Sequence, residues 1–193
     1  MSRLHRPLAA PVAPADGEVA DEPDNASPGI DVDLMAKLIA TAYPDSCFAT
    51  PCGVLAPLLD ALLTFHSRFT IVHREDNALA LASGAAITGK RAVVLMQNSG
   101  FGQSVNVLAS LVGPFTAPIG LIVSMRGTEV DDTWENRGMG RATIPVLESL
   151  GLAWRELDRR GWKETLTWFG EAGRDKPATL LVPPSLFGWS PAQ

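Results

Sequence analysis

One uninterrupted run of apolar residues constrains the fold of this chain more than any other feature. Residues 92–96, Ala-Val-Val-Leu-Met, include no polar side chain. Such a run is typical of a central strand in a parallel sheet, because helices cover both faces of that sheet and leave the strand no exposed side. The rest of the chain has to supply the neighbouring strands and the covering helices.

Short apolar segments and segments of helical periodicity alternate along the remaining sequence. Strands are expected at 47–50, 69–72, 92–96, 118–125, 152–154 and 178–182. Helices are expected at 31–43, 53–66, 76–88, 103–112, 142–150 and 162–172, and a polar loop at 126–140. Because strands and helices alternate about six times, the predicted fold class is α/β: a three-layer sandwich around a six-stranded, mainly parallel sheet.

The first 29 residues differ from the rest of the chain. They are rich in Ala, Pro and Asp, and they lack the apolar core of a signal peptide. This composition buries too little apolar surface to offset the entropy of ordering, so residues 1–29 are expected to form a disordered tail. A flexible arm that docks on a partner is the alternative. Residues 30–193 are long enough for one domain with its own core.

Charge and cysteine content argue against several classes of protein. The formal net charge is -5, from 16 basic and 21 acidic residues, which argues against nucleic-acid binding. No apolar run reaches the roughly 20 residues of a membrane span, so no membrane contact is expected. Cys47 and Cys52 are not spaced as a metal knuckle, and a reducing, cytoplasmic location is expected.

Two segments carry candidate chemistry. Glu75 follows the strand at 69–72, and Gln97-Asn98-Ser99-Gly100 follows the strand at 92–96. Ligands bind at the carboxyl edge of open α/β sheets, so a carboxylate and a glycine at that edge indicate a cofactor pocket. Glu75 could instead cap the next helix, but Asp76 is available for that role. The segment 97–99 could be an ordinary turn, although its place beside Glu75 favours ligand contact.

The helix after Glu75 is made largely of small residues. Its sequence from Ala78 to Ala86 is Ala-Leu-Ala-Leu-Ala-Ser-Gly-Ala-Ala. Such a face has little bulk to fill a core but allows another backbone to come close. We therefore expect the face from Ala78 to Ala86 to be buried against another subunit.

The region from Glu75 to Asn106 resembles the pyrimidine-binding domain of thiamine-diphosphate enzymes. The shared features are the glutamate, an alanine-rich helix ending in Thr88-Gly89-Lys90, a strand, and Ser99-Gly100-Phe101-Gly102. Within that family the chain is most similar to sulfopyruvate and phosphonopyruvate decarboxylases, through Met96–Asn106, Met125-Arg126-Gly127 and Gly138–Thr143. The resemblance runs from about Asp45 to Thr143 and implies the pyrimidine-domain fold.

The resemblance implies roles for individual residues. Glu75 would be catalytic: the family's glutamate hydrogen-bonds N1′ of the aminopyrimidine and favours the imino tautomer, whose N4′ then deprotonates C2 of the thiazolium. Contacts to thiamine diphosphate are expected from Glu75, Pro51, Asn98, Ser99 and Gly100. Contacts to the substrate are expected from Gln97, Asn98, Arg126 and Cys52.

Arg126 has two possible roles at the sequence level. A guanidinium at this edge can bind a phosphonate, sulfonate or carboxylate with two parallel hydrogen bonds. It can equally form a salt bridge to Asp131, Asp132 or Glu135. Both possibilities remain open here.

One half of the family's active site has no counterpart in this sequence. The family holds the diphosphate and Mg²⁺ with a second domain that carries Gly-Asp-Gly, a motif absent from this chain. No metal ligand is therefore assigned here. The expected partner is a diphosphate-binding subunit, which would hold most of the Mg²⁺ shell within a hetero-oligomer.

The resemblance implies an enzyme that decarboxylates a small anionic 2-oxoacid and is active only with its partner subunit. Phosphonopyruvate, giving phosphonoacetaldehyde and CO2, is the preferred substrate at this stage. The alternatives are a sulfopyruvate decarboxylase subunit, a carboligase of the acetolactate-synthase type, and a non-catalytic regulatory subunit.

Overall fold

The computed structural model describes residues 29–190, which form one six-stranded sheet with every strand parallel to its neighbours. The strand order is β2-β1-β3-β4-β6-β5. The strands are β1 (Ser46–Ala49), β2 (Phe69–Ile71), β3 (Ala92–Gln97), β4 (Ile119–Ser124), β5 (Ala153–Glu156) and β6 (Ala178–Val182). The tail expected at residues 1–29 lies outside the described residues, except for Gly29.

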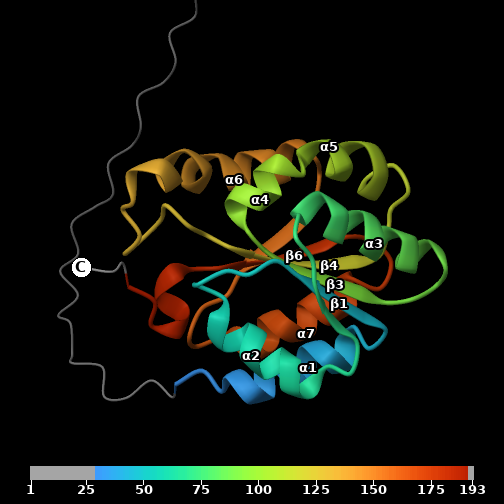
Figure 1. The fold of residues 1–193 in the computed structure, drawn as a ribbon, viewed down its shortest axis with the longest axis horizontal. Coiled ribbons are helices and arrows are strands. Elements are labelled where there is room, and N and C mark those ends of the chain that lie inside the picture. Colours follow the sequence, from blue (N-terminus) through green and yellow to red (C-terminus); the bar gives the residue numbers. More distant parts are fainter. Residues whose placement is uncertain (1–28, 191–193) are drawn as a thin grey trace, which may run out of the picture.

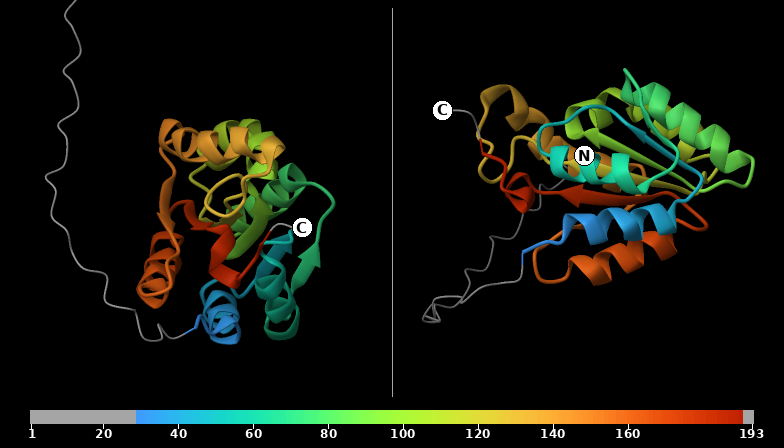
Figure 2. Two further views of the ribbon diagram at one scale, coloured as in Figure 1. Left: turned by 90° about the vertical axis from the view of Figure 1, so that its left-hand side faces the viewer. Right: turned by 60° about the horizontal axis from the view of Figure 1, so that its bottom comes forward.

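Helices cover both faces of the sheet, as Figures 1 and 2 show. On one face lie α1 (Val32–Ala42), α2 (Ala56–Phe65) and α7 (Trp162–Ala172). On the other lie α3 (Glu75–Ile87), α4 (Asn98–Gln103), α5 (Val105–Val107) and α6 (Arg137–Ser149). The predicted α/β three-layer sandwich is confirmed, with one apolar core on each side of the sheet.

The central strands show why the sheet is parallel and covered on both sides. Every residue of β4 and β6 is buried, as is β3 except for Gln97 at its end. At Gly120 in β4 the missing side chain leaves room for two rings, because a Cβ there would lie 2.6 Å from both Tyr43 and Phe169. Tyr43 also donates a hydrogen bond of 2.9 Å to the carbonyl of Phe169, which ties α7 to the end of α1. None of the helices in the described part of the chain is long and apolar enough to cross a membrane.

The helix expected at 103–112 begins earlier than predicted. The helix α4 already begins at Asn98, and the chain continues through α5 into a π-helical turn at Leu108–Val112. The hydroxyl of Ser104 donates to the carbonyl of Gly100 at 2.7 Å, so the chain stays helical through the glycine-bearing segment. The turn considered at 97–99 is therefore helical from Asn98 onwards.

The loop expected at 126–140 is also shorter than predicted, because α6 starts at Arg137. Gly138 and Gly140 lie inside the helix and do not interrupt it. A Cβ at Gly140 would lie 2.7 Å from the carbonyl carbon of Gly127, so this glycine allows a close contact between backbones. The glycines of this segment were interpreted as a loop signal, whereas Gly140 marks close packing of two backbones.

The small-residue helix does not pack as expected. Ala78, Ala82 and Ala86 are buried in this chain's own core, next to residues of β3 and β4. Small side chains let α3 lie close to the sheet, so the expectation that this whole face contacts another subunit was wrong. The opposite face of α3 is exposed and apolar, and it comprises Ala80, Leu81, Gly84 and Ile87.

Candidate active site

The segments that follow four neighbouring strands meet at one edge of the sheet. Because all strands are parallel, residues 72–75 after β2, 50–53 after β1, 97–100 after β3 and 125–127 after β4 share the carboxyl edge. In Figure 1 this edge faces left, where the C-terminal segment also lies. The sequence-predicted site residues are all on these four segments.

Glu75 and Gly100 are in direct contact at this edge. Glu75 is the first residue of α3 and is partly buried, whereas Gly100 in α4 is buried. A Cβ on Gly100 would overlap the carboxyl group of Glu75, so the two helices can meet only with glycine at this position. Asp76 pairs with Arg74 and accepts the Asn77 N–H at 2.9 Å.

The Glu75 carboxylate itself has no hydrogen-bond partner among residues 29–190. No side chain caps the amino end of α3, so the capping role considered for Glu75 is not observed. A carboxylate that is partly buried, packed against a glycine and free of hydrogen-bond partners is available to a ligand.

Asn98 connects β3 to β4. Its side chain is fully buried, and its Nδ2 donates a hydrogen bond of 2.8 Å to the carbonyl of Arg126. Its Oδ1 is also buried and has no partner in the described residues. Since an unpaired buried acceptor costs free energy, a donor from a bound group would stabilise this site.

The remaining residues predicted at this edge differ in accessibility. Ser99 and Pro51 are exposed, and the Gln97 side chain donates to the Ser99 hydroxyl at 2.9 Å. Cys52 is buried, with its thiol sulfur 3.1 Å from the hydroxyl oxygen of Ser124 in β4. The structure thus places Cys52 in contact with the neighbouring strand, away from open solvent.

Arg126 forms an ion pair with Asp131, one of the three partners that the sequence suggested. The pair is buried, with 18% of the Arg126 side chain and none of the Asp131 side chain exposed. Asp131 also accepts hydrogen bonds from the backbone of Gly127 at 2.9 Å, from Asn136 at 3.2 Å and from Thr133.

These donors decide the charge state of Asp131. Burial alone would raise the pKa of its carboxyl, but the hydrogen bonds from Arg126, Thr133 and Gly127 outweigh burial. The pKa of Asp131 is therefore held well below its usual range, and the carboxylate is charged at neutral pH. Arg126 engages it only through Nε, so Nη1 and Nη2 have no partner within the described part of the chain.

Trp189 is a site residue that sequence reasoning missed. The Arg126 guanidinium lies over its ring, 4.5 Å from the centre. The indole nitrogen also lies beside Gly53, 3.6 Å from where a Cβ would stand. The only signal in the sequence was a single aromatic residue in a Gly- and Pro-containing terminal segment, which has no periodicity to interpret.

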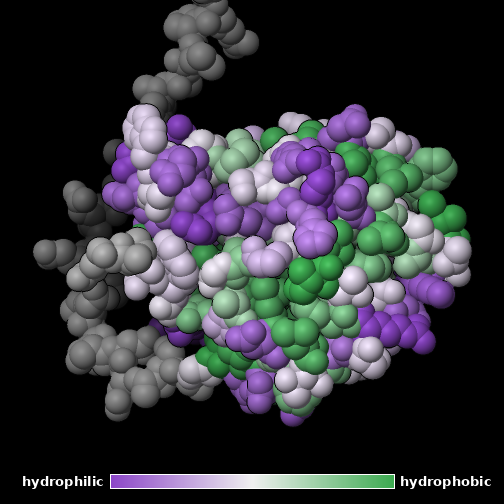
Figure 3. All heavy atoms as spheres, viewed as in Figure 1, coloured by the Kyte–Doolittle hydropathy of each residue, from purple (hydrophilic) through white to green (hydrophobic). Residues whose placement is uncertain are grey.

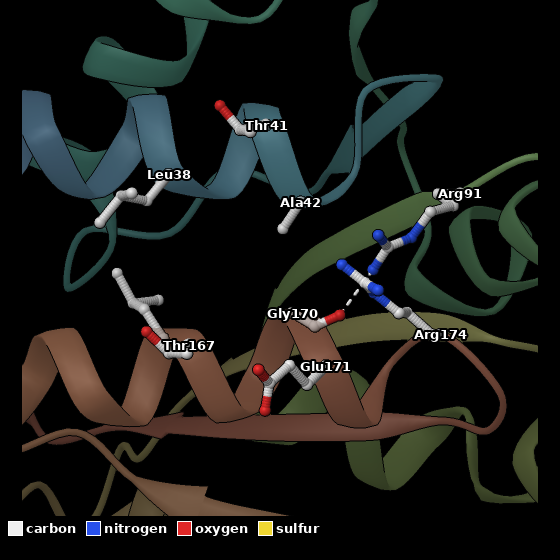
Figure 4. Close-up of a pocket in the computed structure, with 9 residues that line it drawn as sticks. Leu38, Thr41, Ala42, Arg91, Thr167, Gly170, Glu171 and Arg174 are labelled. Carbon is white, nitrogen blue, oxygen red and sulfur yellow. Dashed lines mark hydrogen bonds between the residues drawn. The ribbon is translucent and has the colours of Figure 1, made fainter.

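A separate pocket of about 250 Å³ lies between α1 and α7, near the amino end of β3 (Figure 4). Arg91 donates from Nη2 to the carbonyl of Gly170 at 2.7 Å, and Arg174 also lines the pocket. Both arginines stand at the carboxyl end of α7, where positive charge complements the helix dipole. The pocket lies at the amino edge of the sheet, opposite to the edge that carries Glu75, so it is not part of the candidate site. Among residues 29–190, no group of three His, Cys, Asp or Glu side chains could hold a metal ion.

Comparison with known proteins identifies the family of this chain. Residues 32–133 match the family model described as thiamine pyrophosphate enzyme, N-terminal TPP binding domain. The chain is 40% identical over 112 residues to sulfopyruvate decarboxylase subunit alpha of Methanothermobacter thermautotrophicus, a match that covers 58% of this chain and 68% of that protein. It is 33% identical over 124 residues to phosphonopyruvate decarboxylase of Streptomyces viridochromogenes, covering 63% of this chain and 31% of that protein.

A solved structure supports the fold independently. It is a putative thiamin diphosphate-dependent enzyme from Mycobacterium smegmatis, superposed with a TM-score of 0.62 at 20% identity. The match covers 84% of this chain and 32% of that one, so this chain spans about a third of its structural relative. The family expected from the sequence is confirmed: the chain belongs to the thiamine pyrophosphate enzymes and contains their N-terminal cofactor-binding domain.

Proposed function

We propose that this chain is the pyrimidine-binding subunit of a thiamine-diphosphate-dependent 2-oxoacid decarboxylase that acts on sulfopyruvate. The observation that carries the proposal is the partner-free carboxylate of Glu75, packed on Gly100 in a member of this family. The sequence reasoning preferred phosphonopyruvate. That preference is replaced, because the similarity to a sulfopyruvate decarboxylase alpha subunit, at 40%, exceeds the similarity to a phosphonopyruvate decarboxylase, at 33%.

The residues at the edge fit the aminopyrimidine of thiamine diphosphate. The ring offers nitrogen acceptors and an amino donor along its edge, and this chain offers the Glu75 carboxyl group and the unpaired Oδ1 of Asn98. Pro51, Ser99 and Gly100 would complete the contacts to the cofactor. The domain assignment of residues 30–193 to pyrimidine binding is part of the same proposal.

When bound, thiamine diphosphate supplies the nucleophilic carbon and the electron sink for decarboxylation. The role of this chain is to bind, orient and exchange a proton. Glu75 would share a proton between its carboxyl oxygen and a pyrimidine nitrogen, and its contact with Gly100 holds the carboxyl group in place for this role. Arg126 provides a positive charge for the anionic substrate, while Gln97, Asn98 and Cys52 shape the wall beside it.

The proposed partner is a separate diphosphate-binding subunit that would hold Mg²⁺ through phosphate oxygens and its own carboxylates. The support is that several relatives are named as alpha subunits. The exposed face of α3, formed by Ala80, Leu81, Gly84 and Ile87, is the surface that we assign to this contact. Figure 3 shows apolar side chains gathered on the side of the molecule where α3 and α5 lie. The two thiols are free, which supports a cytoplasmic location.

Phosphonopyruvate is the second candidate substrate, since phosphonopyruvate decarboxylases are also among the relatives. A sulfonate and a phosphonate both accept hydrogen bonds from a guanidinium, so Arg126 serves either substrate.

Reconstitution tests the proposed function. The chain is co-expressed with a diphosphate-binding subunit, and CO2 release is measured with sulfopyruvate, phosphonopyruvate and pyruvate, with and without thiamine diphosphate and Mg²⁺. The proposal expects cofactor-dependent turnover that is fastest with sulfopyruvate. Product that joins two substrate molecules, in place of a free aldehyde, would identify a carboligase, and absence of any turnover would support a regulatory subunit.

A further inference from the structure

The Arg126 guanidinium is held on two of its sides. Its Nε donates to the buried carboxylate of Asp131, and its flat face lies on the ring of Trp189 at 4.5 Å. An arginine presents its N–H donors in a rigid planar fork, so fixing Nε and the plane also fixes the direction of Nη1 and Nη2. These two nitrogens have no partner among residues 29–190.

Asp131 is anchored independently of Arg126. The backbone N–H of Gly127, the side chain of Asn136 and the hydroxyl of Thr133 all donate to it. The carboxylate therefore cannot follow the arginine if the arginine moves. The Asp131 carboxylate also offsets part of the positive charge of Arg126. Asp131 can therefore favour the binding of an anionic ligand only by orienting Arg126.

The position of Arg126 in the sheet differs from that of Glu75. It follows β4, on the far side of β3 from β1 and β2. Glu75 comes from the β2 side of the sheet and stops against Gly100. Arg126 and Glu75 therefore reach the carboxyl edge from opposite sides of β3.

We propose that Nη1 and Nη2 of Arg126 bind the anionic group at the tail of the substrate, and that Asp131 and Trp189 are positioning residues for this contact. The assignment rests on the proposed decarboxylase function. The ligand class is a short 2-oxoacid whose third carbon carries a sulfonate or phosphonate. Two parallel hydrogen bonds from a preoriented fork match the oxygens of such a group.

The test uses the complete complex with its diphosphate-binding subunit. The kcat and KM values are measured for sulfopyruvate, phosphonopyruvate and pyruvate, the last of which has the common carboxylate but no anionic tail. Three variants are compared with the wild type: Asp131→Asn, Trp189→Leu and, as a matched control, Asp132→Asn. Asp132 is the adjacent carboxylate, and 86% of its side chain is exposed.

In Asp131→Asn, the ratio of kcat/KM for the tailed substrates to that for pyruvate should fall about tenfold or more, mainly through KM. Trp189→Leu leaves the Asp131 hydrogen bonds in place and should lower the same ratio about threefold. It keeps the proposal open to test if Asp131→Asn fails to fold. Asp132→Asn should leave the ratio at the wild-type value.

Three results would overturn the proposal. The first is an unchanged ratio in both Asp131→Asn and Trp189→Leu. The second is a lower KM for sulfopyruvate in Asp131→Asn than in the wild type. This would mean that the net charge beside Arg126 determines substrate binding and that the orientation of Arg126 does not. The third is an equal loss for all three substrates, which would place Arg126 on the common carboxylate. A wild-type complex that decarboxylates none of the substrates overturns the proposed function itself and removes the basis of this assignment.

Discussion

The carboxyl group of Glu75 occupies the space in which a side chain of residue 100 would lie. The Glu75 side chain in α3 therefore packs directly against the backbone of Gly100 in α4. This relation links a backbone position to the direction of the candidate catalytic carboxylate.

Gly100→Ala should displace the Glu75 side chain and remove most turnover of the reconstituted complex. The added methyl group cannot fit without moving the carboxyl group, because the two would overlap. Steady-state turnover and thermal unfolding should be measured together. Gly138→Ala in α6 is the matched control: its Cβ meets nothing within 4 Å, so activity should persist and stability should rise by up to about 1 kcal/mol. Normal activity in Gly100→Ala would show that the orientation of Glu75 is unimportant.

Glu75→Gln should fold and assemble normally but lose most decarboxylation. The amide fills the same space, but it cannot share a proton with a pyrimidine nitrogen as a carboxyl group does. Turnover is measured with saturating thiamine diphosphate, so that weaker cofactor binding does not mimic the loss. Asp76→Asn, next in sequence and paired with Arg74, should retain activity. If instead Asp76→Asn were inactive and Glu75→Gln active, the catalytic carboxylate would be the neighbouring one.

Gly84→Leu should weaken assembly with the partner subunit while leaving the isolated chain folded. Gly84 is exposed on α3 and has open space around it, so a larger side chain would meet only another subunit. Overpacking a contact typically costs about 1–3 kcal/mol. Light scattering should report a lower mass for the complex, with turnover falling in parallel. Gly138→Leu, which has equally open surroundings on α6, serves as the control. An unchanged mass in Gly84→Leu would exclude this face from the interface.

Asp131 should make stability depend on pH in the acidic range. Folding lowers the pKa of Asp131. The contribution of Asp131 to the free energy of unfolding is therefore fully present above its pKa in the unfolded chain, about 3.9, and is lost as pH falls towards its pKa in the folded chain. The free energy of unfolding, from urea titrations, should decline between about pH 4 and pH 2. The decline should be shallower in Asp131→Asn and unchanged in Asp132→Asn. Equal slopes in all three proteins would mean that the Asp131 hydrogen bonds do not persist in solution.

Much of the fold follows from apolar patterning in the sequence. The run at 92–96 is a fully buried central strand, and the order of strands and helices is as expected. Glycines were harder to interpret. Gly138 and Gly140 both lie within α6. At Gly140 the close contact with Gly127 requires an absent side chain, and local sequence cannot distinguish that need from a loop.

The candidate site was predictable only in part. Glu75, Asn98 and Arg126 were identified because they follow strands, and the sheet brings such residues to one edge. Trp189 comes from the far end of the chain, and only the tertiary fold places it beside Arg126. Small residues on α3 were misassigned for a related reason, since burial against the chain's own sheet and burial against a partner leave the same sequence pattern.

The contact between Gly127 and Gly140 closes the intervening segment into a loop with two fixed ends. Val130 and Trp134 in this loop are exposed, whereas Asp131 between them is buried. The exposed positions can therefore change in sequence without displacing Arg126, provided that Asp131 and its donor Thr133 are kept. This division offers a route to new substrate preference by exchanging the exposed side chains alone, with the edge of the sheet that carries Glu75 left intact.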